Sequence, residues 1–168
     1  HGPQQQFGNY GLSFICNMSF YSELFTGTTL AFSQEQQRIL TSLLLEGYQW
    51  IIWRGYWDVN ALNRQLFRNA DIDKGFSLLF AAHSLMKSSE PEVADQIKKM
   101  ILRNSSFSQV PNSFTGNKHF RESDYTVHRT PTWLASVRMA SERVIGTELV
   151  NEDNLKGYYM ADGALYTY

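Results

Sequence analysis

The first hundred residues carry apolar side chains at helical spacing. Phe14, Met18, Tyr21 and Phe25 recur at intervals of three and four positions, so the pattern predicts a helix over Gly11–Phe25. A second helical pattern follows and extends to about residue 53, and a third covers residues 72–86. The third is apolar on almost every side around residues 76–82, so we expect it to be buried all round.

Two short motifs predict where helices begin. Ser33-Gln34-Glu35-Gln36 has the form of a capping box, with a hydroxyl N-cap and a Gln at the third helical position. Ser89-Glu90-Pro91-Glu92 combines the same form with an early proline and predicts a fourth helix that ends near Arg103.

The periodicity changes in the last third of the chain. Residues 104–124 are rich in Ser, Asn and Gly, which predicts a linker. Apolar and polar residues then alternate over Trp133–Met139, which predicts a strand, and residues 143–147 are a shorter candidate. An Asp162-Gly163 turn between residues 158–160 and 164–166 predicts a β-hairpin.

These patterns predict an α+β chain with a helical domain over residues 1–107 and a linker with a β domain over residues 108–168. So few strands make a β layer that is too small to bury a face of its own. We therefore expect a fragment, which holds the end of a helical domain and the start of a β domain.

Composition narrows the classes of function. The 168 residues carry a net charge of −1, which gives no global field for a nucleic-acid partner. No apolar run reaches the roughly 18 to 20 residues that a membrane span needs. Cys16 is the single cysteine, which excludes an internal disulfide and a cysteine-based zinc site. We expect no metal, no cofactor and no nucleic-acid or membrane partner.

Aromatic residues make up 14% of the chain and crowd one short segment. Such a cluster is either helix core or a platform on which sugar rings stack, and the sequence leaves both interpretations open. The cluster consists of Tyr48, Trp50, Trp53, Tyr56 and Trp57.

Two arginines and one tyrosine are candidates for chemistry. If the local chain is helical, Arg64 and Arg68 share one helix face, where paired guanidinium groups suit a carboxylate or a sulfate. Tyr10 is a poor base at neutral pH unless a nearby cation favours its phenolate form. The polar cluster over residues 148–154 is by itself more typical of a loop than of a site.

His1-Gly2-Pro3-Gln4, with Tyr10 nine residues after His1, resembles the catalytic segment of family 8 polysaccharide lyases. Further matches follow in order along nearly the whole chain and include two arginines, a Ser-Asp-Tyr motif and a series of polar residues. They are Arg64, Arg68, Ser123-Asp124-Tyr125, His128-Arg129, Arg138-Met139, Ser141, Arg143, Glu148, Asn151, Asn154, Gly157 and Asp162-Gly163.

The resemblance implies the last helices of an incomplete α/α toroid, followed by the first strands of an antiparallel β-sandwich domain. It implies a carbon-oxygen lyase that cleaves uronic-acid-containing glycosaminoglycans, chondroitin sulfate and hyaluronan, by β-elimination and uses no cofactor. The partner is then an anionic polysaccharide, and the expected location is periplasmic or secreted, because such polymers lie outside the cytoplasm.

The resemblance also implies roles for individual residues. Tyr10 is the general base and then the general acid, and His1 helps to neutralise the substrate carboxylate. Arg64 or Arg68 favours the phenolate and contacts the substrate. Glu148 and Asn151 orient this network from the β domain, and Asn151 also binds the substrate.

The neutralising Asn of the family precedes the histidine and is not among these residues. We therefore expect the isolated chain to be poorly active or inactive, and to need preceding toroid helices and the remaining β domains.

Four alternatives remain beside the glycosaminoglycan lyase. The first is xanthan lyase, which belongs to the same family, the second is a non-catalytic carbohydrate-binding module, and the third is a plain structural role. The fourth begins from His1, whose amine and imidazole could chelate copper as in lytic polysaccharide monooxygenases. That family is an all-β sandwich, whereas the first part of this chain predicts helices.

Overall fold

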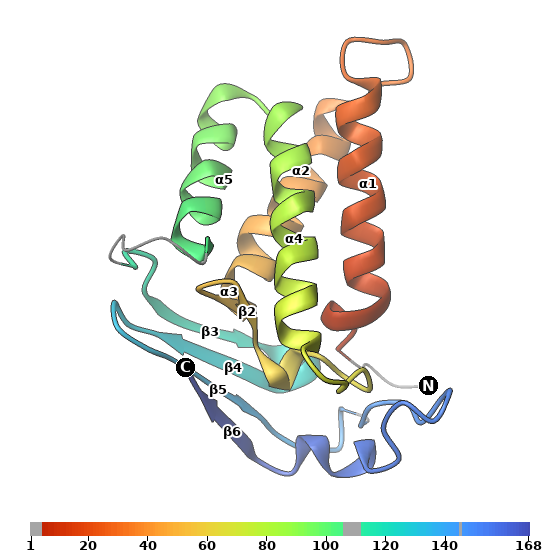
Figure 1. The fold of residues 1–168 in the computed structure, drawn as a ribbon, viewed down its shortest axis with the longest axis vertical. Coiled ribbons are helices and arrows are strands. Elements are labelled where there is room, and N and C mark those ends of the chain that lie inside the picture. Colours follow the sequence, from red (N-terminus) through yellow and green to blue (C-terminus); the bar gives the residue numbers. More distant parts are fainter. Residues whose placement is uncertain (1–4, 106–111, 145) are drawn as a thin grey trace.

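The structure is a computed structural model that describes residues 5–105, 112–144 and 146–168. Its first part is helical, and the helices stand over one face of a sheet formed by the last part (Figure 1). The helices are α1 (Leu12–Phe25), α2 (Gln34–Ser42), α3 (Gln49–Ile51), α4 (Ala70–Lys87) and α5 (Pro91–Asn104). A π-helical turn over Leu43–Tyr48 joins α2 to α3, so this predicted helix is nearly continuous.

Four antiparallel strands in the described residues form the sheet, in the order β3-β4-β5-β6. They are β3 (Gly116–Phe120), β4 (Tyr125–Arg129), β5 (Leu134–Arg138) and β6 (Ala164–Thr167). A separate short hairpin pairs β1 (Ile52–Trp53) with β2 (Tyr56–Trp57). Helices followed by an antiparallel sheet confirm the predicted α+β class, whereas the closure of the helices into a toroid stays a prediction.

Local hydrogen bonds confirm one predicted capping box and not the other. Ser33 Oγ accepts from the Gln36 backbone N–H at 3.3 Å, and Gln36 Oε1 accepts from the Ser33 N–H at 2.9 Å. The second box does not form, because the Ser89 hydroxyl donates back to the Leu85 carbonyl at 2.7 Å. Pro91 at the first helical position is confirmed.

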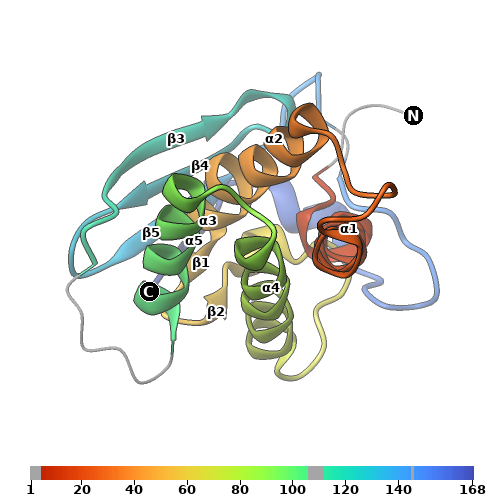
Figure 2. The same ribbon diagram turned by 90° about the horizontal axis from the view of Figure 1, so that it is seen from above.

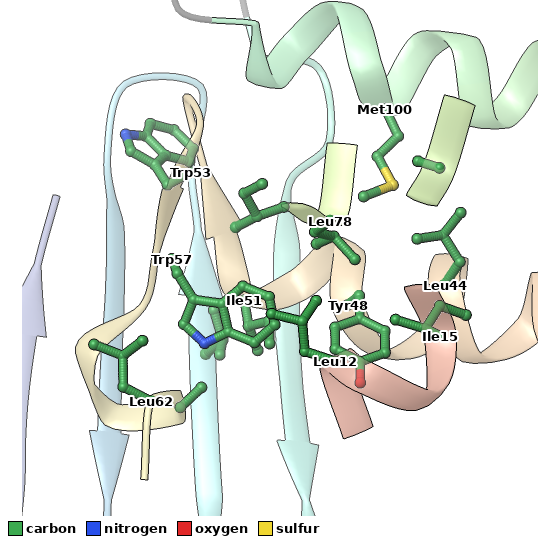
Figure 3. Packing of buried hydrophobic residues seen from close by; sticks show 14 of the residues in the cluster. Leu12, Ile15, Leu44, Tyr48, Ile51, Trp53, Trp57, Leu62, Leu78 and Met100 are labelled. Carbon is green, nitrogen blue, oxygen red and sulfur yellow. The ribbon is translucent and has the colours of Figure 1, made fainter. Parts of the chain in front are cut away.

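The core lies between the helices and the inner face of the sheet (Figure 3). Tyr48, Trp53 and Trp57 are buried in it, and Trp57 packs 5.7 Å from Tyr48 between ring centroids. For these three residues the structure decides between the two aromatic interpretations in favour of core. Tyr56, by contrast, is exposed.

Helix α4 packs against α1, α5 and β2, as the view from above shows for the helices (Figure 2). Gly75 is required there, because a Cβ at this position would lie 1.9 Å from the Gly55 carbonyl oxygen. Only one face of α4 is covered: Leu78 is fully buried, but Phe76 and Phe80 are 73% and 63% exposed. The expectation that this helix is buried all round was therefore wrong. No helix in the described part of the chain has the length and apolarity to cross a membrane.

Three predictions about the last third of the chain were also wrong. Strand β3 lies inside the predicted linker, where only pairing with β4 reveals it. No strand forms at the described residues of 143–147, where Ser141 and Val144 make an isolated bridge. The predicted hairpin is absent because residues 157–161 form a 3-10 helix, and β6 pairs with β5 instead.

Buried hydrogen bonds join the sheet to the helical part. The Asp58 carboxylate, which follows β2, accepts from the hydroxyls of Tyr125 on β4 and Tyr168 at the end of β6, the latter at 3.2 Å. The Asn60 backbone N–H is a further donor to it, also at 3.2 Å. Burial nevertheless raises the pKa of Asp58, because the charged form loses its hydration.

Arg129 on β4 makes a second connection between the sheet and the helical part. Its guanidinium donates to the carbonyl oxygens of Gln49, Trp50 and Ile52 at 3.2, 3.0 and 2.9 Å. These carbonyls lie at the end of α3, where helical partners run out. The end of α3 is therefore satisfied by a residue of the sheet.

The raised pKa of Asp58 predicts a pH-dependent contribution to stability. The folded state binds a proton here more readily than the unfolded state, so ionised Asp58 opposes folding at neutral pH. The free energy of unfolding of the wild type, relative to that of Asp58→Asn, should rise from about pH 7 to about pH 4 and level off below it. Urea unfolding of both proteins across this range measures the difference, and a difference that falls on acidification contradicts the assignment.

Candidate functional site

Tyr10 lies on a π-helical turn, Phe7–Gly11, that leads into α1, and its side chain is 60% exposed. The turn is distorted at Asn9, whose φ of −130° and ψ of −107° are not helical. Gly8 allows the turn to pack on another segment, since a Cβ there would lie 2.5 Å from the Ala61 carbonyl oxygen. The Tyr10 turn thus rests on the backbone that leads to Arg64.

The two candidate arginines lie in a loop, residues 62–69, and not in a helix. They therefore do not share a helix face. Left-handed backbone at Asn63 and Asn69, with φ of 58° and 63°, separates this loop from the helical turns on both sides. Arg64 is only 4% exposed, whereas Arg68 is exposed. Within the described residues the structure gives Arg68 no hydrogen-bond or ion-pair partner.

Arg64 is held by acceptors from two distant segments. Its Nη1 pairs with the Glu148 carboxylate, and its Nε donates to Asp153 Oδ2 at 2.9 Å. The Asn9 amide, with its oxygen turned to the guanidinium, accepts from Nη1 at 3.1 Å and from Nη2 at 3.3 Å. Two carboxylates and one amide therefore fix the position of this buried cation.

Arg64 also faces Tyr10, with its guanidinium carbon 5.5 Å from the centre of the phenol ring. Hydrogen bonding to the Tyr10 phenol raises the pKa of Arg64, and the Asp153 carboxylate raises it further, against the effect of desolvation. The guanidinium thus stays charged beside an exposed phenol.

The structure brings together three of the predicted site residues: Tyr10, Arg64 and Glu148. Glu148 follows β5 in the chain, and its side chain is 28% exposed. Asn151 is exposed on a turn with a φ of 60° and makes no recorded bond to Tyr10 or Arg64 among the described residues. His1 lies outside the described residues.

The sequence did not point to three further residues at this site. Asp153 belongs to the polar cluster that reads as a loop, and Asn9 is the neighbour of Tyr10. Lys74 lies on α4, 7% exposed, and donates to the Gly8 carbonyl and, at 2.6 Å, to Gln65 Oε1. Burial lowers the pKa of Lys74.

An exposed phenol beside a fixed buried cation is suited to proton transfer with a bound molecule. In the residues that the structure describes, no three His, Cys, Asp or Glu side chains gather where they could hold a metal ion.

Comparison with known proteins points to one family. Residues 115–168 match the model of the polysaccharide lyase family 8 super-sandwich domain. The chain is 30% identical over 167 residues to Chondroitinase-AC of Pedobacter heparinus. This alignment covers 98% of the chain and 23% of that protein. It is 24% identical over 190 residues to Hyaluronate lyase of Thermasporomyces composti, covering 95% of the chain and 24% of the relative.

A solved structure agrees with the sequence comparison. The chondroitinase AC lyase studied in complexes with oligosaccharides superimposes on this chain with a TM-score of 0.81 at 26% identity. The match covers 100% of this chain and 25% of that one. The chain thus spans about a quarter of the length of the relatives that it matches.

The two carboxylates on Arg64 should depend on each other. Glu148→Gln and Asp153→Asn should each lower the free energy of unfolding by about 1–2 kcal/mol, because each single variant still leaves one carboxylate paired with the Arg64 guanidinium. The double variant should lose more than both single losses together, because the buried guanidinium then lacks any carboxylate. Urea unfolding measures all three, with the exposed Glu122→Gln as control, and additive losses would contradict a shared clamp.

Proposed function

The chain belongs to polysaccharide lyase family 8, and from this premise we propose that it takes part in the cleavage of uronic-acid-containing glycosaminoglycans by β-elimination. The observation that carries the proposal is the meeting of exposed Tyr10 with buried, carboxylate-bound Arg64. The names of the relatives, a chondroitinase AC and a hyaluronate lyase, support chondroitin sulfate and hyaluronan as the substrate class.

In the proposed reaction Tyr10 moves the proton. As phenolate it takes the proton from C5 of the uronic acid, and the electron pair forms the C4–C5 double bond while the C4–O bond breaks. The phenol then returns the proton to the leaving oxygen, so that one residue serves as base and acid. An exposed hydroxyl is needed for this, because the polymer must reach it from solvent.

In this proposal Arg64 acts on Tyr10 through electrostatics. Its positive charge stabilises the phenolate electrostatically, and Glu148 keeps the guanidinium in place. The carboxylate beside C5 must also be neutralised before the C5 proton becomes acidic. We assign a part in that step to His1, together with an Asn that the family places before it.

Arg68 and Asn151 are proposed to contact the polymer. Both are exposed, and neither belongs to the ion-pair cluster around Arg64. An exposed guanidinium retains its fork of donors for a carboxylate or a sulfate. We place the reaction in the periplasm or outside the cell, since polymers of this size are met there.

Tyr10→Phe tests the proposed function in the full-length protein that carries this chain. Wild type should release unsaturated uronic acid from chondroitin sulfate or hyaluronan, followed by ultraviolet absorbance. Tyr10→Phe should lower kcat by about 100- to 10,000-fold, because no proton carrier remains, with KM little changed.

Tyr56→Phe, which removes the hydroxyl of another exposed tyrosine, should leave kcat unchanged. A wild type that binds the polymer without releasing unsaturated product would favour the carbohydrate-binding module instead.

Arg68→Ala should act on binding and not on the chemical step. We expect KM for chondroitin sulfate to rise about tenfold with kcat within about twofold of wild type, because one charged contact made equally in ground and transition state is lost. Steady-state kinetics check this, with the exposed Arg121→Ala as the control. A loss confined to kcat would instead place Arg68 at the reacting atoms.

A further inference from the structure

Lys74 links the two segments that carry Tyr10 and Arg64. Its ammonium group donates to the carbonyl of Gly8, which precedes Tyr10 by two residues in the chain. It also donates to the side chain of Gln65, the residue that follows Arg64. A single cation therefore links both segments close in the chain to Tyr10 and Arg64.

Lys74 has an aromatic ring and one carboxylate as further neighbours. Its Nζ lies 5.8 Å from the centre of the Phe67 ring, and no ion pair is recorded for it in the described part of the chain. Asp153 is the charged group that acts on it, through space, while burial lowers the pKa of Lys74. The ammonium group is buried with its hydrogen bonds to Gly8 and Gln65 in place of a direct carboxylate partner, and its removal leaves both acceptors without this donor.

The bridge is built on a rigid base. Lys74 lies in the first half of α4, whose neighbouring residues Ala70, Gly75 and Leu78 are buried. Helix α4 packs along α1 and against β2, and Gly75 sits directly on the β1–β2 turn. The ammonium group is thus presented from an element that cannot shift without disturbing the core.

The two segments that it joins are irregular, by contrast. The Tyr10 turn is distorted at Asn9, and the Arg64 loop begins and ends with left-handed residues, Asn63 and Asn69. The Arg64 loop lacks the ladder of backbone hydrogen bonds that fixes a helix or a strand, and the Tyr10 segment is a single π-helical turn. The Asn9 amide joins the two segments directly, and Lys74 adds a link to the rigid helix α4.

We propose that Lys74 is a positioning residue, which sets the geometry of Tyr10 against Arg64 by holding both of their segments to α4. This inference rests on the proposed lyase function, because the geometry it sets is that of the proposed proton carrier and its cation. Lys74 acts through the backbone of Gly8 and the side chain of Gln65 and touches no substrate atom.

Lys74→Met in the full-length lyase tests this, since methionine keeps the length of the side chain and removes its donors and charge. We expect kcat to fall about 10- to 100-fold with KM within about twofold, as for a misplacement of about 1 Å. The midpoint of the rise of kcat with pH should also move up by about half a unit, because Arg64 is then less well placed to favour the phenolate.

Gln65→Met breaks one half of the bridge and keeps the lysine. It should cause a smaller loss in kcat than Lys74→Met and the same upward shift of the pH midpoint of kcat. The kcat of the double variant should be no lower than that of Lys74→Met. Lys87→Met is the matched control on the same helix, where the lysine pairs with Glu23 of α1, and it should leave kcat and the pH profile unchanged.

The outcomes separate the two proposals. If the wild type releases no unsaturated product, the proposed function fails. If the wild type is active and Lys74→Met keeps its kcat, or loses activity only through a lower melting temperature with an unmoved pH midpoint, the positioning role is overturned. Should Lys74→Met fail to fold, Gln65→Met decides, and an unchanged kcat and midpoint in that variant would equally overturn it.

Discussion

The structure depends on the need of buried guanidinium groups for acceptors. Arg64, Arg129 and Arg138 are all removed from solvent, and burying a guanidinium costs free energy for each donor that is left unpaired. Arg129 on β4 donates to carbonyls at the end of α3, and Arg138 on β5 donates to the carbonyl of Asn60 and the amide oxygen of Asn63, each at 3.4 Å. These hydrogen bonds form only when the sheet is docked on the helical part, although Nε and Nη2 of Arg138 find no partner among the described residues.

Arg64 extends this rule to the candidate site. Its loop belongs to the helical part, and its two carboxylates come from the segment after β5. These carboxylates reach the cation beside Tyr10 only when the segment between β5 and β6 folds back against the helices. This explains physically why the site lies at the junction: the guanidinium is costly to bury, and the junction supplies the carboxylates that permit its burial.

The two arginines that the sequence presents as a pair have separate environments, and the separation suits a lyase. Arg64 is neutralised in part by Glu148 and Asp153, so it is fixed and inaccessible to a polymer. Arg68 is exposed and free to bind an anion within the described part of the chain. In the proposed function one guanidinium serves the proton carrier and the other the polymer, and Lys74 connects the segments of Tyr10 and Arg64.

The sequence alone determined the features that rest on local hydrogen bonding and periodicity: the helices, the capping box at Ser33, the proline at the start of α5 and the α+β class. Tyr10 and Arg64 were candidates because of their side-chain chemistry, whereas Glu148 was a candidate only through the resemblance to family 8. Prediction from the sequence failed where partners are distant. Strand β3 forms because it pairs with β4, and β6 pairs with β5 in place of the predicted hairpin partner. Phe76 is exposed because only one face of α4 contacts other elements. At the site, no spacing of residues in the sequence predicted where Asp153, Asn9 and Lys74 lie, because their partners are far away in the chain. Periodicity reports which face of an element is apolar, but the pairing of a buried charge is settled only when the whole chain has brought its acceptors to it.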